Sequence, residues 1–262
     1  MSALVLENRI LHYEHFGRGR PLIFIHGWLG SWRYWVSAMD ALSEEHRTYA
    51  FDLWGFGDSD KSHNQYTVDS YVDLLHSFIV ELGVFVPVPL VGHALGAIVA
   101  ISFAAQYPDI AERVMAISLP TGGSTINQRI LLGGSSILDR VLGRSPTAGY
   151  ADVEQEASRT APDAIRQSVE SVMNIDLHAK LSALGVPLLV VYGEHDNVVA
   201  PPPAKTFDGL GHSVRVFLMP ECRHFPMLDR SSQFNRLLLD YLQGSDDLNE
   251  LGLKNEWQRR IR

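Results

Sequence analysis

One glycine-flanked stretch has residue types and spacing that bear directly on chemistry. Gly92-His93-Ala94-Leu95-Gly96 follows an apolar run and precedes a helical pattern. It matches the pattern G-x-S-x-G, in which a serine on a strained strand-to-helix turn projects its hydroxyl into a reaction site. Here the serine position is Ala94, and a methyl group cannot attack a carbonyl carbon. The stretch therefore predicts a turn built to present a nucleophile, with the nucleophilic atom missing.

Two later segments carry side chains that suit the same chemistry. Gly193-Glu194-His195-Asp196 and Arg223-His224-Phe225-Pro226 each follow an apolar, strand-like run. Attack on a carbonyl also needs a base within hydrogen-bond reach, and a group that orients this base and favours its protonated form. We expect His224 to be the base and Asp196 the orienting carboxylate. The alternatives are a surface or core-filling role for His224 and a helix-capping role for Asp196, with Glu194 as a competing acid.

The elements that must position these residues follow an alternating pattern. Short β-branched and apolar runs alternate with longer helical patterns, which is typical of a mainly parallel sheet covered by helices on both faces. The expected core strands are 22–25, 48–51, 88–91, 114–117, 188–192 and 214–219. A leading antiparallel hairpin is expected at 3–6 and 10–13, and helices at 66–82, 95–106 and 231–242. The candidate residues all follow strands, where open α/β sheets bind their ligands.

The alternation stops between residue 121 and about residue 181. Glycine- and serine-rich stretches at 122–124 and 133–136 are followed there by helical patterns, with no convincing strand. We therefore predict a helical cap at 121–181, inserted into a core formed by 1–120 and 182–243. The polar residues 244–262 are expected to form a peripheral tail.

The chain order of these sites matches a known family. Position 94, Asp196 and His224 follow in the order nucleophile, acid, histidine, and His26-Gly27-Trp28 follows the first core strand. In this order residues 10–243 resemble the α/β-hydrolase superfamily, and within it the carboxylesterase-type serine hydrolases. The resemblance implies the α/β-hydrolase fold, a mostly parallel sheet with helices on both faces and a small inserted helical cap. It also implies an oxyanion hole formed by the backbone N–H groups of Trp28 and Leu95.

Other residues near these motifs have both functional and structural interpretations. His26, Trp28 and His93 are candidate substrate-binding residues, although His26 can instead buttress the oxyanion loop and His93 can be a structural neighbour. Cys222 is expected to be a small buried filler. Segment 52–60 contains three carboxylates, but its glycines and Ser/Asp turn chemistry suit a bracing loop rather than a metal site. Arg223 departs from the family pattern, which commonly has glycine before the histidine.

Composition excludes several classes of protein. A chain of 262 residues with 46% hydrophobic and 20% charged residues fits one α/β domain with an insertion. The net charge of -8 provides no basic surface for nucleic acid or for an anionic membrane. The N-terminus lacks a signal pattern, and no stretch reaches the roughly 18 apolar residues of a membrane span, so we expect a cytoplasmic protein. The single cysteine excludes an intrachain disulfide and multi-cysteine metal sites, and no metal or cofactor is expected.

The expected activity is that of a carboxylesterase-like acyl hydrolase. Apolar cap residues and the tryptophans near the site favour a small apolar ester as the partner, unless they only pack the cap onto the core. The His-Gly-Trp motif resembles pimeloyl-ester esterases. With Ala94 in place of serine, a Ser-His-Asp mechanism is inactive in the chain as given. The alternatives are a natural non-catalytic ligand-binding homologue and a lyase that uses His224 as a base without a covalent step.

Overall fold

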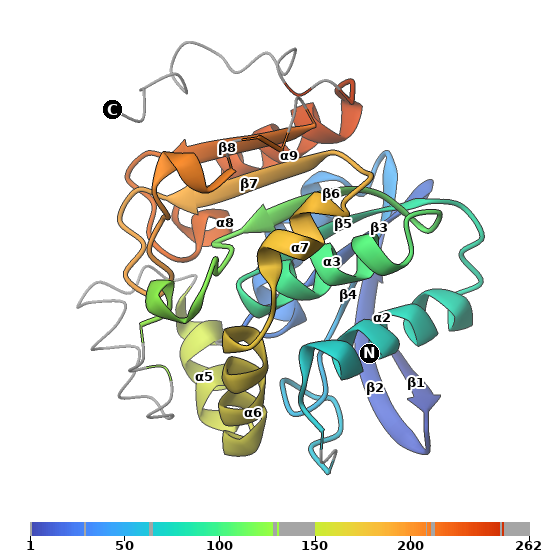
Figure 1. The fold of residues 1–262 in the computed structure, drawn as a ribbon. Helices are drawn as coiled ribbons and strands as arrows, with labels where there is room; N and C mark the ends of the chain where they lie inside the picture. The colour runs from blue at the N-terminus through green and yellow to red at the C-terminus, as the bar shows by residue number, and fades with distance from the viewer. Residues whose placement is uncertain are drawn as a thin grey trace.

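An eight-stranded sheet forms the centre of the molecule. A computed structural model describes residues 2–28, 30–62, 65–127, 130, 150–207, 209–210, 213–246 and 248. The strand order is β1-β2-β4-β3-β5-β6-β7-β8 (Figure 1). The pairs β1–β2 and β2–β4 are antiparallel, and all pairs from β4 to β8 are parallel. The strands are β1 (Ser2–Leu6), β2 (Arg9–Phe16), β3 (Arg20–Ile25), β4 (His46–Phe51), β5 (Val88–His93), β6 (Ala111–Ile117), β7 (Leu188–Gly193) and β8 (Val214–Met219). The expected mostly parallel sheet is confirmed.

The central strands are apolar because both of their faces are covered. Every residue of β5 and of β7 is buried. Side chains in parallel strands between two helical layers have no solvent-facing side, so these strands read as continuous apolar runs rather than alternating ones. Each core strand expected from the sequence lies inside an observed strand, and the leading hairpin is present as β1 and β2.

Helices cover the two faces of the sheet. In Figure 1, α2, α3 and α7 lie in front of the sheet and α9 lies behind it. The described helical segments before residue 121 and after residue 182 are η1 (Trp32–Trp35), α1 (Val36–Ala41), α2 (Val68–Glu81), α3 (Leu95–Gln106), η5 (Ala204–Phe207), α8 (Pro226–Asp229) and α9 (Ser231–Gln243). The helix expected at 66–82 begins at Val68 because Thr67 is its N-cap. Thr67 Oγ1 accepts the N–H of Ser70 at 3.2 Å, and Ser70 Oγ accepts the N–H of Thr67 at 3.1 Å.

The region expected to form the cap is only partly described. It contains η2 (Gly123–Thr125), α5 (Ala151–Arg159), α6 (Pro162–Met173) and α7 (Leu177–Ser182). Helix α5 contacts η1, and α6 contacts α2 and α3. Residues 128–129 and 131–149 lie outside the described residues, as does most of the expected tail at 244–262, so this division into core, cap and tail stays a prediction. In the described part of the chain, no helix combines the length and apolar character needed to cross a lipid bilayer.

The turn from β5 into α3 depends on close backbone packing at two glycines. A Cβ on Gly92 would lie 2.2 Å from the carbonyl oxygen of Gly96. A Cβ on Gly96 would lie 2.2 Å from the carbonyl oxygen of Ile25, at the end of β3. Neither obstacle is a flexible side chain, so only glycine lets α3 begin this close to β3 and β5.

We predict that Gly96→Ala destabilises the fold strongly. The added methyl overlaps main-chain oxygen atoms that can move only with β3. We therefore expect the free energy of unfolding to be about 2–4 kcal/mol lower than in the parent chain. The measurement is urea unfolding followed by circular dichroism. The control is Gly185→Ala, where an added Cβ meets nothing within 4 Å, and a change within about 1 kcal/mol is expected. Equal unfolding midpoints for the two variants would contradict this account of the turn.

Candidate active site

Ala94 occupies a backbone conformation that alanine rarely adopts. Its φ is 48° and its ψ is −107°, and its N–H donates to the carbonyl oxygen of Ile117 at 2.8 Å. This conformation costs about 1–3 kcal/mol for a residue with a Cβ, and it persists only where the surrounding structure imposes it. The chain thus makes a sharp turn at the position where the sequence pattern places a nucleophile.

Asp196 and His224 form a buried pair. His224 Nδ1 lies 2.9 Å from Asp196 Oδ2 and 3.1 Å from Oδ1, and the two residues are 2% and 7% exposed. Asp196 Oδ1 also accepts the N–H groups of Val198 at 2.8 Å and Val199 at 2.9 Å. Burial alone would raise the pKa of Asp196, but His224 and the other donors outweigh burial and leave this pKa below its ordinary value. The carboxylate is therefore charged and orients the imidazole.

This contact determines which nitrogen of His224 can act as a base. The ionised carboxylate only accepts hydrogen bonds, so Nδ1 carries the proton and Nε2 of the neutral ring has the free lone pair. Among the described residues, the hydrogen bonds of the His224 ring are made by Nδ1 and not by Nε2. His224 is thus arranged to take a proton from a group outside this hydrogen-bond network.

Sequence reasoning missed Ser118, which completes the environment of Asp196. Its hydroxyl donates to Asp196 Oδ2 at 2.7 Å, it is fully buried, and its φ is +49°. Ser118 directly follows β6, next in the sheet to the strand that leads into Ala94. A polar residue at the carboxyl end of an apolar strand was the available signal. Its positive φ could not be read from the sequence.

The two N–H groups expected to form the oxyanion hole have no protein partner in the described chain. Leu95 is the first residue of α3, so its N–H lacks a partner within the helix. Neither this N–H nor that of Trp28 donates to another group of the described residues. The Trp28 side chain is 1% exposed, and its indole Nε1 donates to Ser168 Oγ on α6 at 3.0 Å. A Cβ on Gly27 would lie 3.0 Å from the Ala94 Cβ, so the segment before Trp28 runs beside the turn.

His26 and His93 are buried, and both ring nitrogens of each contact the protein. His26 Nδ1 donates to the carbonyl oxygen of Gly27 at 2.9 Å, and Nε2 accepts the N–H of Leu53 at 2.9 Å. His93 Nδ1 lies 3.1 Å from Tyr34 Oη, and Nε2 lies 2.8 Å from the carbonyl oxygen of His224. Burial lowers the pKa of both rings, that of His93 strongly. Neither histidine has a ring nitrogen left for a substrate.

The loop that carries His224 is held by residues next to it. Cys222 is fully buried, and burial raises the pKa of its thiol to about 12. Arg223, at the position where the family commonly has glycine, donates its N–H to Asp229 Oδ2 at 2.7 Å and its guanidinium to Oδ1 at 3.1 Å. The guanidinium also lies over the ring of Tyr150, 4.7 Å from its centroid. Arg223 thereby joins residues 220–225, the loop between β8 and α8 that we call the base loop, to Tyr150, the residue that precedes α5.

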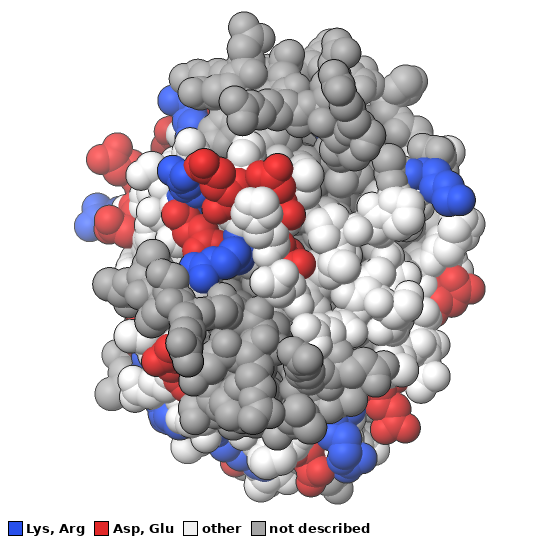
Figure 2. All heavy atoms as spheres, turned by 90° about the vertical axis from the view of Figure 1, so that its left-hand side faces the viewer, with Lys and Arg blue, Asp and Glu red and all other residues white. Residues whose placement is uncertain are grey.

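Figure 2 shows the face toward which the arrowheads of β6, β7 and β8 point in Figure 1. Acidic and basic side chains gather in one part of this face, next to a broad area that carries neither. The ion pair of Arg230 with Glu221 joins the residue between α8 and α9 to the loop after β8. Because Asp196 and His224 are almost wholly buried, the pair lies beneath this face rather than on it.

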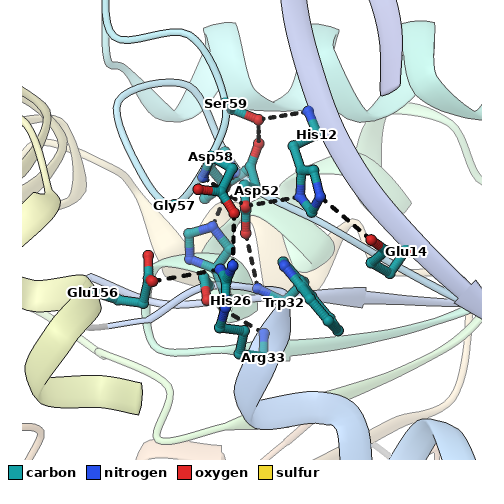
Figure 3. Close-up of polar contacts among 12 residues, drawn as sticks. His12, Glu14, His26, Trp32, Arg33, Asp52, Gly57, Asp58, Ser59 and Glu156 are labelled. Carbon is teal, nitrogen blue, oxygen red and sulfur yellow. Dashed lines mark hydrogen bonds and ion pairs between the residues drawn. The ribbon is translucent and has the colours of Figure 1, made fainter. Parts of the chain in front are cut away.

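A second His–carboxylate contact joins strand β2 to the loop of residues 52–60 (Figure 3). His12 Nδ1 is 3.2 Å from Asp52 Oδ2, and Asp52 accepts the N–H of Trp32 at 2.8 Å and of Asp58 at 2.9 Å. Ser59 Oγ donates to the carbonyl oxygen of Asp52 at 2.6 Å and accepts the N–H of His12 at 2.9 Å. Burial opposes protonation of His12, but Asp52 and the nearby carboxylates raise its pKa above the ordinary value.

Asp58 joins this loop to two arginines from other elements. Arg33 of η1 donates to Asp58 Oδ2 at 2.8 Å, and Arg159 of α5 donates to Oδ1. The buried Glu156 of α5 contacts both arginines, at 3.0 Å to Arg159 and 3.4 Å to Arg33, and Figure 3 shows the contact with Arg33. Partial burial would raise the pKa of Asp58, but the two arginines lower it to about 2. We refer to these four residues, Arg33, Asp58, Glu156 and Arg159, as the Asp58 network.

Two carboxylates of this loop and His12 of β2 form a group with metal-ligand spacing. His12, Asp52 and Asp58 place ligand atoms within 4.8 Å of one another. Asp52 already accepts two main-chain N–H groups, and both oxygens of Asp58 bind arginines. These guanidinium groups would also repel a cation. The contacts suit a loop that braces its neighbours better than they suit a metal site.

Comparison with known proteins places the fold among hydrolases. A family model described as "alpha/beta hydrolase fold" matches residues 20–167. The chain is 23% identical over 248 residues to the pimeloyl-[acyl-carrier protein] methyl ester esterase of Vibrio campbellii, covering 86% of this chain and 95% of the relative. It is 24% identical over 261 residues to the 2-hydroxy-6-oxo-6-(2'-aminophenyl)hexa-2,4-dienoic acid hydrolase of Metapseudomonas resinovorans, covering 90% and 88%. The crystal structure of a putative aryl esterase from Burkholderia cenocepacia matches with a TM-score of 0.80 and 26% identity, covering 92% and 97%.

We predict that Asp58→Asn weakens the fold in a pH-dependent way. The folded pKa of about 2 lies below the unfolded value near 3.9, so the carboxylate stabilises the fold above about pH 4 and loses this effect as the pH falls toward 2. Allowing for solvent screening, we expect a loss of about 1–2 kcal/mol at pH 7 that shrinks as the solution is acidified. The measurement is urea unfolding of both proteins at several pH values.

The matched control is Asp163→Asn. Asp163 pairs with Arg166 on the same helix and is 67% exposed, so a change of at most about 0.5 kcal/mol is expected. A difference between Asp58→Asn and the parent chain that stays constant from pH 7 to pH 3 would count against the Asp58 network as the source of the effect.

Proposed function

The chain belongs to the alpha/beta hydrolase family, and on this premise we propose that its site has the base and oxyanion groups of a carboxylesterase-like acyl hydrolase. His224 is the base, Asp196 orients it, and the N–H groups of Trp28 and Leu95 receive the carbonyl oxygen of a small ester. Position 94 is the nucleophile position. Because it is alanine, the chain as given forms no acyl-enzyme.

The backbone of Ala94 is the observation that carries this proposal. A φ of 48° with a ψ of −107° is costly for alanine, and a methyl group gains nothing from being presented there. The same turn leaves the N–H of Leu95 without a partner among the described residues, at the N-terminus of α3, where the helix dipole favours developing negative charge. The strain is understandable if the turn serves to present a side chain to a reacting carbonyl.

The relatives support an ester as the substrate class. One is named as a methyl ester esterase, and a structural neighbour is described as a putative aryl esterase. A serine at position 94 would pass its proton to Nε2 of His224 and attack the carbonyl carbon. The oxyanion would lie against the two N–H groups, and His224 would return the proton to the leaving alcohol. Water would then release the acid by the same route.

A second candidate is general-base chemistry without a covalent step. The observation in its favour is that the His224–Asp196 pair is complete without any contribution from residue 94. In that case the substrate itself supplies the proton that Nε2 takes, and a change at position 94 leaves turnover nearly unaffected.

We predict that Ala94→Ser produces esterase activity. Removing the nucleophile from an assembled triad costs about 10⁶-fold in turnover, or roughly 8 kcal/mol of barrier, so restoring it should be a large effect. We expect the variant to hydrolyse short p-nitrophenyl esters with a burst of one equivalent of acyl-enzyme, and to be labelled by a fluorophosphonate. The parent chain should show neither burst nor label.

The control is the double variant Ala94→Ser, His224→Ala, which should lose the restored activity while it keeps the fold. A folded Ala94→Ser protein that neither bursts with a panel of esters and thioesters nor takes up the phosphonate would end the acyl-hydrolase proposal. Turnover already present in the parent chain and lost on His224→Ala alone would favour the second candidate.

A further inference from the structure

A continuous set of hydrogen bonds links the loop before Trp28 to the loop that carries His224. The N–H of Gly27 donates to Tyr34 Oη at 2.7 Å, and Tyr34 Oη lies 3.1 Å from His93 Nδ1. On the other side of the same ring, His93 Nε2 lies 2.8 Å from the carbonyl oxygen of His224. Four segments meet in this set: the loop after β3, the helical turn η1, the last residue of β5, and the base loop.

The direction of each bond follows from the chemistry of its partners. The carbonyl oxygen of His224 can only accept, so His93 Nε2 carries the proton. Burial, together with the nearby His224 ring, lowers the pKa of His93 well below its ordinary value, so the ring is neutral and its Nδ1 accepts. Tyr34 Oη accepts from Gly27 and must therefore donate to His93. Burial raises the pKa of Tyr34 well above the ordinary value, which keeps the hydroxyl proton in place.

Both side chains are enclosed, and the rings around them are packed closely. Tyr34 is 4% exposed and His93 1% exposed. The ring centroids of His93 and His224 are 4.5 Å apart, and Phe225 lies 5.0 Å from His93 and 5.6 Å from Tyr34. Water has no access to replace a lost hydrogen bond here, so deleting one leaves a buried polar atom unpaired.

We propose that Tyr34 and His93 are positioning residues of the site, which hold the main chain of His224 and the oxyanion loop at a fixed separation from Ala94. The inference rests on the proposed function, because only a reacting carbonyl between these groups makes their separation matter. Neither residue touches the reacting atoms. They act through Gly27, which precedes Trp28, and through the backbone of His224.

Within the described part of the chain, the carbonyl oxygen of His224 has no equally good alternative donor. The carbonyl oxygen of His224 is also 3.3 Å from Ser118 Oγ, but that hydroxyl has one proton and donates it to Asp196 at 2.7 Å. A Cβ on Gly27 would lie 3.0 Å from His93 Nδ1 and 3.0 Å from the Ala94 Cβ. Gly27, His93 and Ala94 are thus in direct contact, so a shift of His93 moves the base and the oxyanion loop relative to each other.

The first test is Tyr34→Phe in the Ala94→Ser protein. The ring and its packing stay, while Gly27 N–H and His93 Nδ1 lose their partner. A misplacement of reacting groups by about 1 Å costs up to about 100-fold in rate, so we expect turnover per active site to fall by about 10- to 100-fold with little change in KM. Burst amplitude counts the active sites, which separates slower chemistry from a smaller folded fraction.

The second test compares two substitutions of His93 in the same protein. In His93→Gln the side-chain amide can still donate to the carbonyl oxygen of His224, whereas His93→Met fills similar space without a donor. We expect His93→Met to lower turnover per active site by at least about tenfold, and His93→Gln to stay within about threefold of Ala94→Ser. If His93 acted through packing alone, the two substitutions would lower turnover by similar amounts. Higher turnover in His93→Gln than in His93→Met therefore identifies the hydrogen bond to His224 as the cause.

The matched control is Tyr241→Phe. Tyr241 Oη is buried and donates to main-chain carbonyl oxygens of Val114 or Pro187, at the opposite end of β6 and β7. This substitution should lower stability by an amount similar to Tyr34→Phe, because each removes one buried hydroxyl, and it should leave turnover per active site unchanged.

A measurement in the parent Ala94 chain keeps the inference separate from the proposed function. The proton on Nδ1 of His224, which is hydrogen-bonded to Asp196, can be followed by ¹H–¹⁵N NMR. This measurement does not require the protein to turn over a substrate. We expect Tyr34→Phe and His93→Met to shift or broaden this signal, and His93→Gln and Tyr241→Phe to leave it in place. If Ala94→Ser is inert, the proposed function fails and the NMR signal alone decides whether the two residues position His224. An unchanged signal and unchanged turnover in both Tyr34→Phe and His93→Met would overturn the inference.

Discussion

The contact between the start of α3 and the end of β3 is the constraint on which the site depends. Gly96 lies against the carbonyl oxygen of Ile25, and Gly92 lies against that of Gly96, with no room for a side chain at either position. The chain must therefore reverse within one residue, and Ala94 takes the positive φ that this requires. This turn also places His93 beside the base loop, and it leaves the N–H of Leu95 with no partner in the part of the chain that the structure describes. A looser junction would move all of these groups at once.

Much of the fold was predictable because its information is local. The runs expected at 88–91 and 188–192 are apolar along their whole length, and they lie in β5 and β7, where covered sheet faces leave every residue buried. From the order of the strands along the chain, residue 94, Asp196 and His224 were expected at the carboxyl ends of the strands. The contact of Asp196 with His224 agrees with that order, and a parallel sheet gives it a physical reason, since its loops converge at one edge.

The parts that sequence reasoning missed depend on contacts between distant segments. Ser118 reaches Asp196 across 78 positions, and Tyr34 reaches His93 across 59. Serine and tyrosine are common at strand ends and in short helices, so neither type signals a partner. The Asp58 network is similar, because its carboxylates and arginines look like ordinary surface charges until α5 is docked. A residue's type is visible in the sequence, whereas its neighbour across the fold is not.

The hydrogen bond from Trp28 to Ser168 ties the oxyanion loop to α6. The N–H of Trp28 has no partner among the described residues, while the Trp28 side chain is anchored on a helix from another part of the chain. Such a shared residue makes ligand occupancy and helix docking thermodynamically linked, and the linkage is reciprocal. A ligand that binds better when α6 is docked must stabilise that docking by the same free energy. Substitutions on α6 thus act on affinity as well as on stability, without touching the ligand.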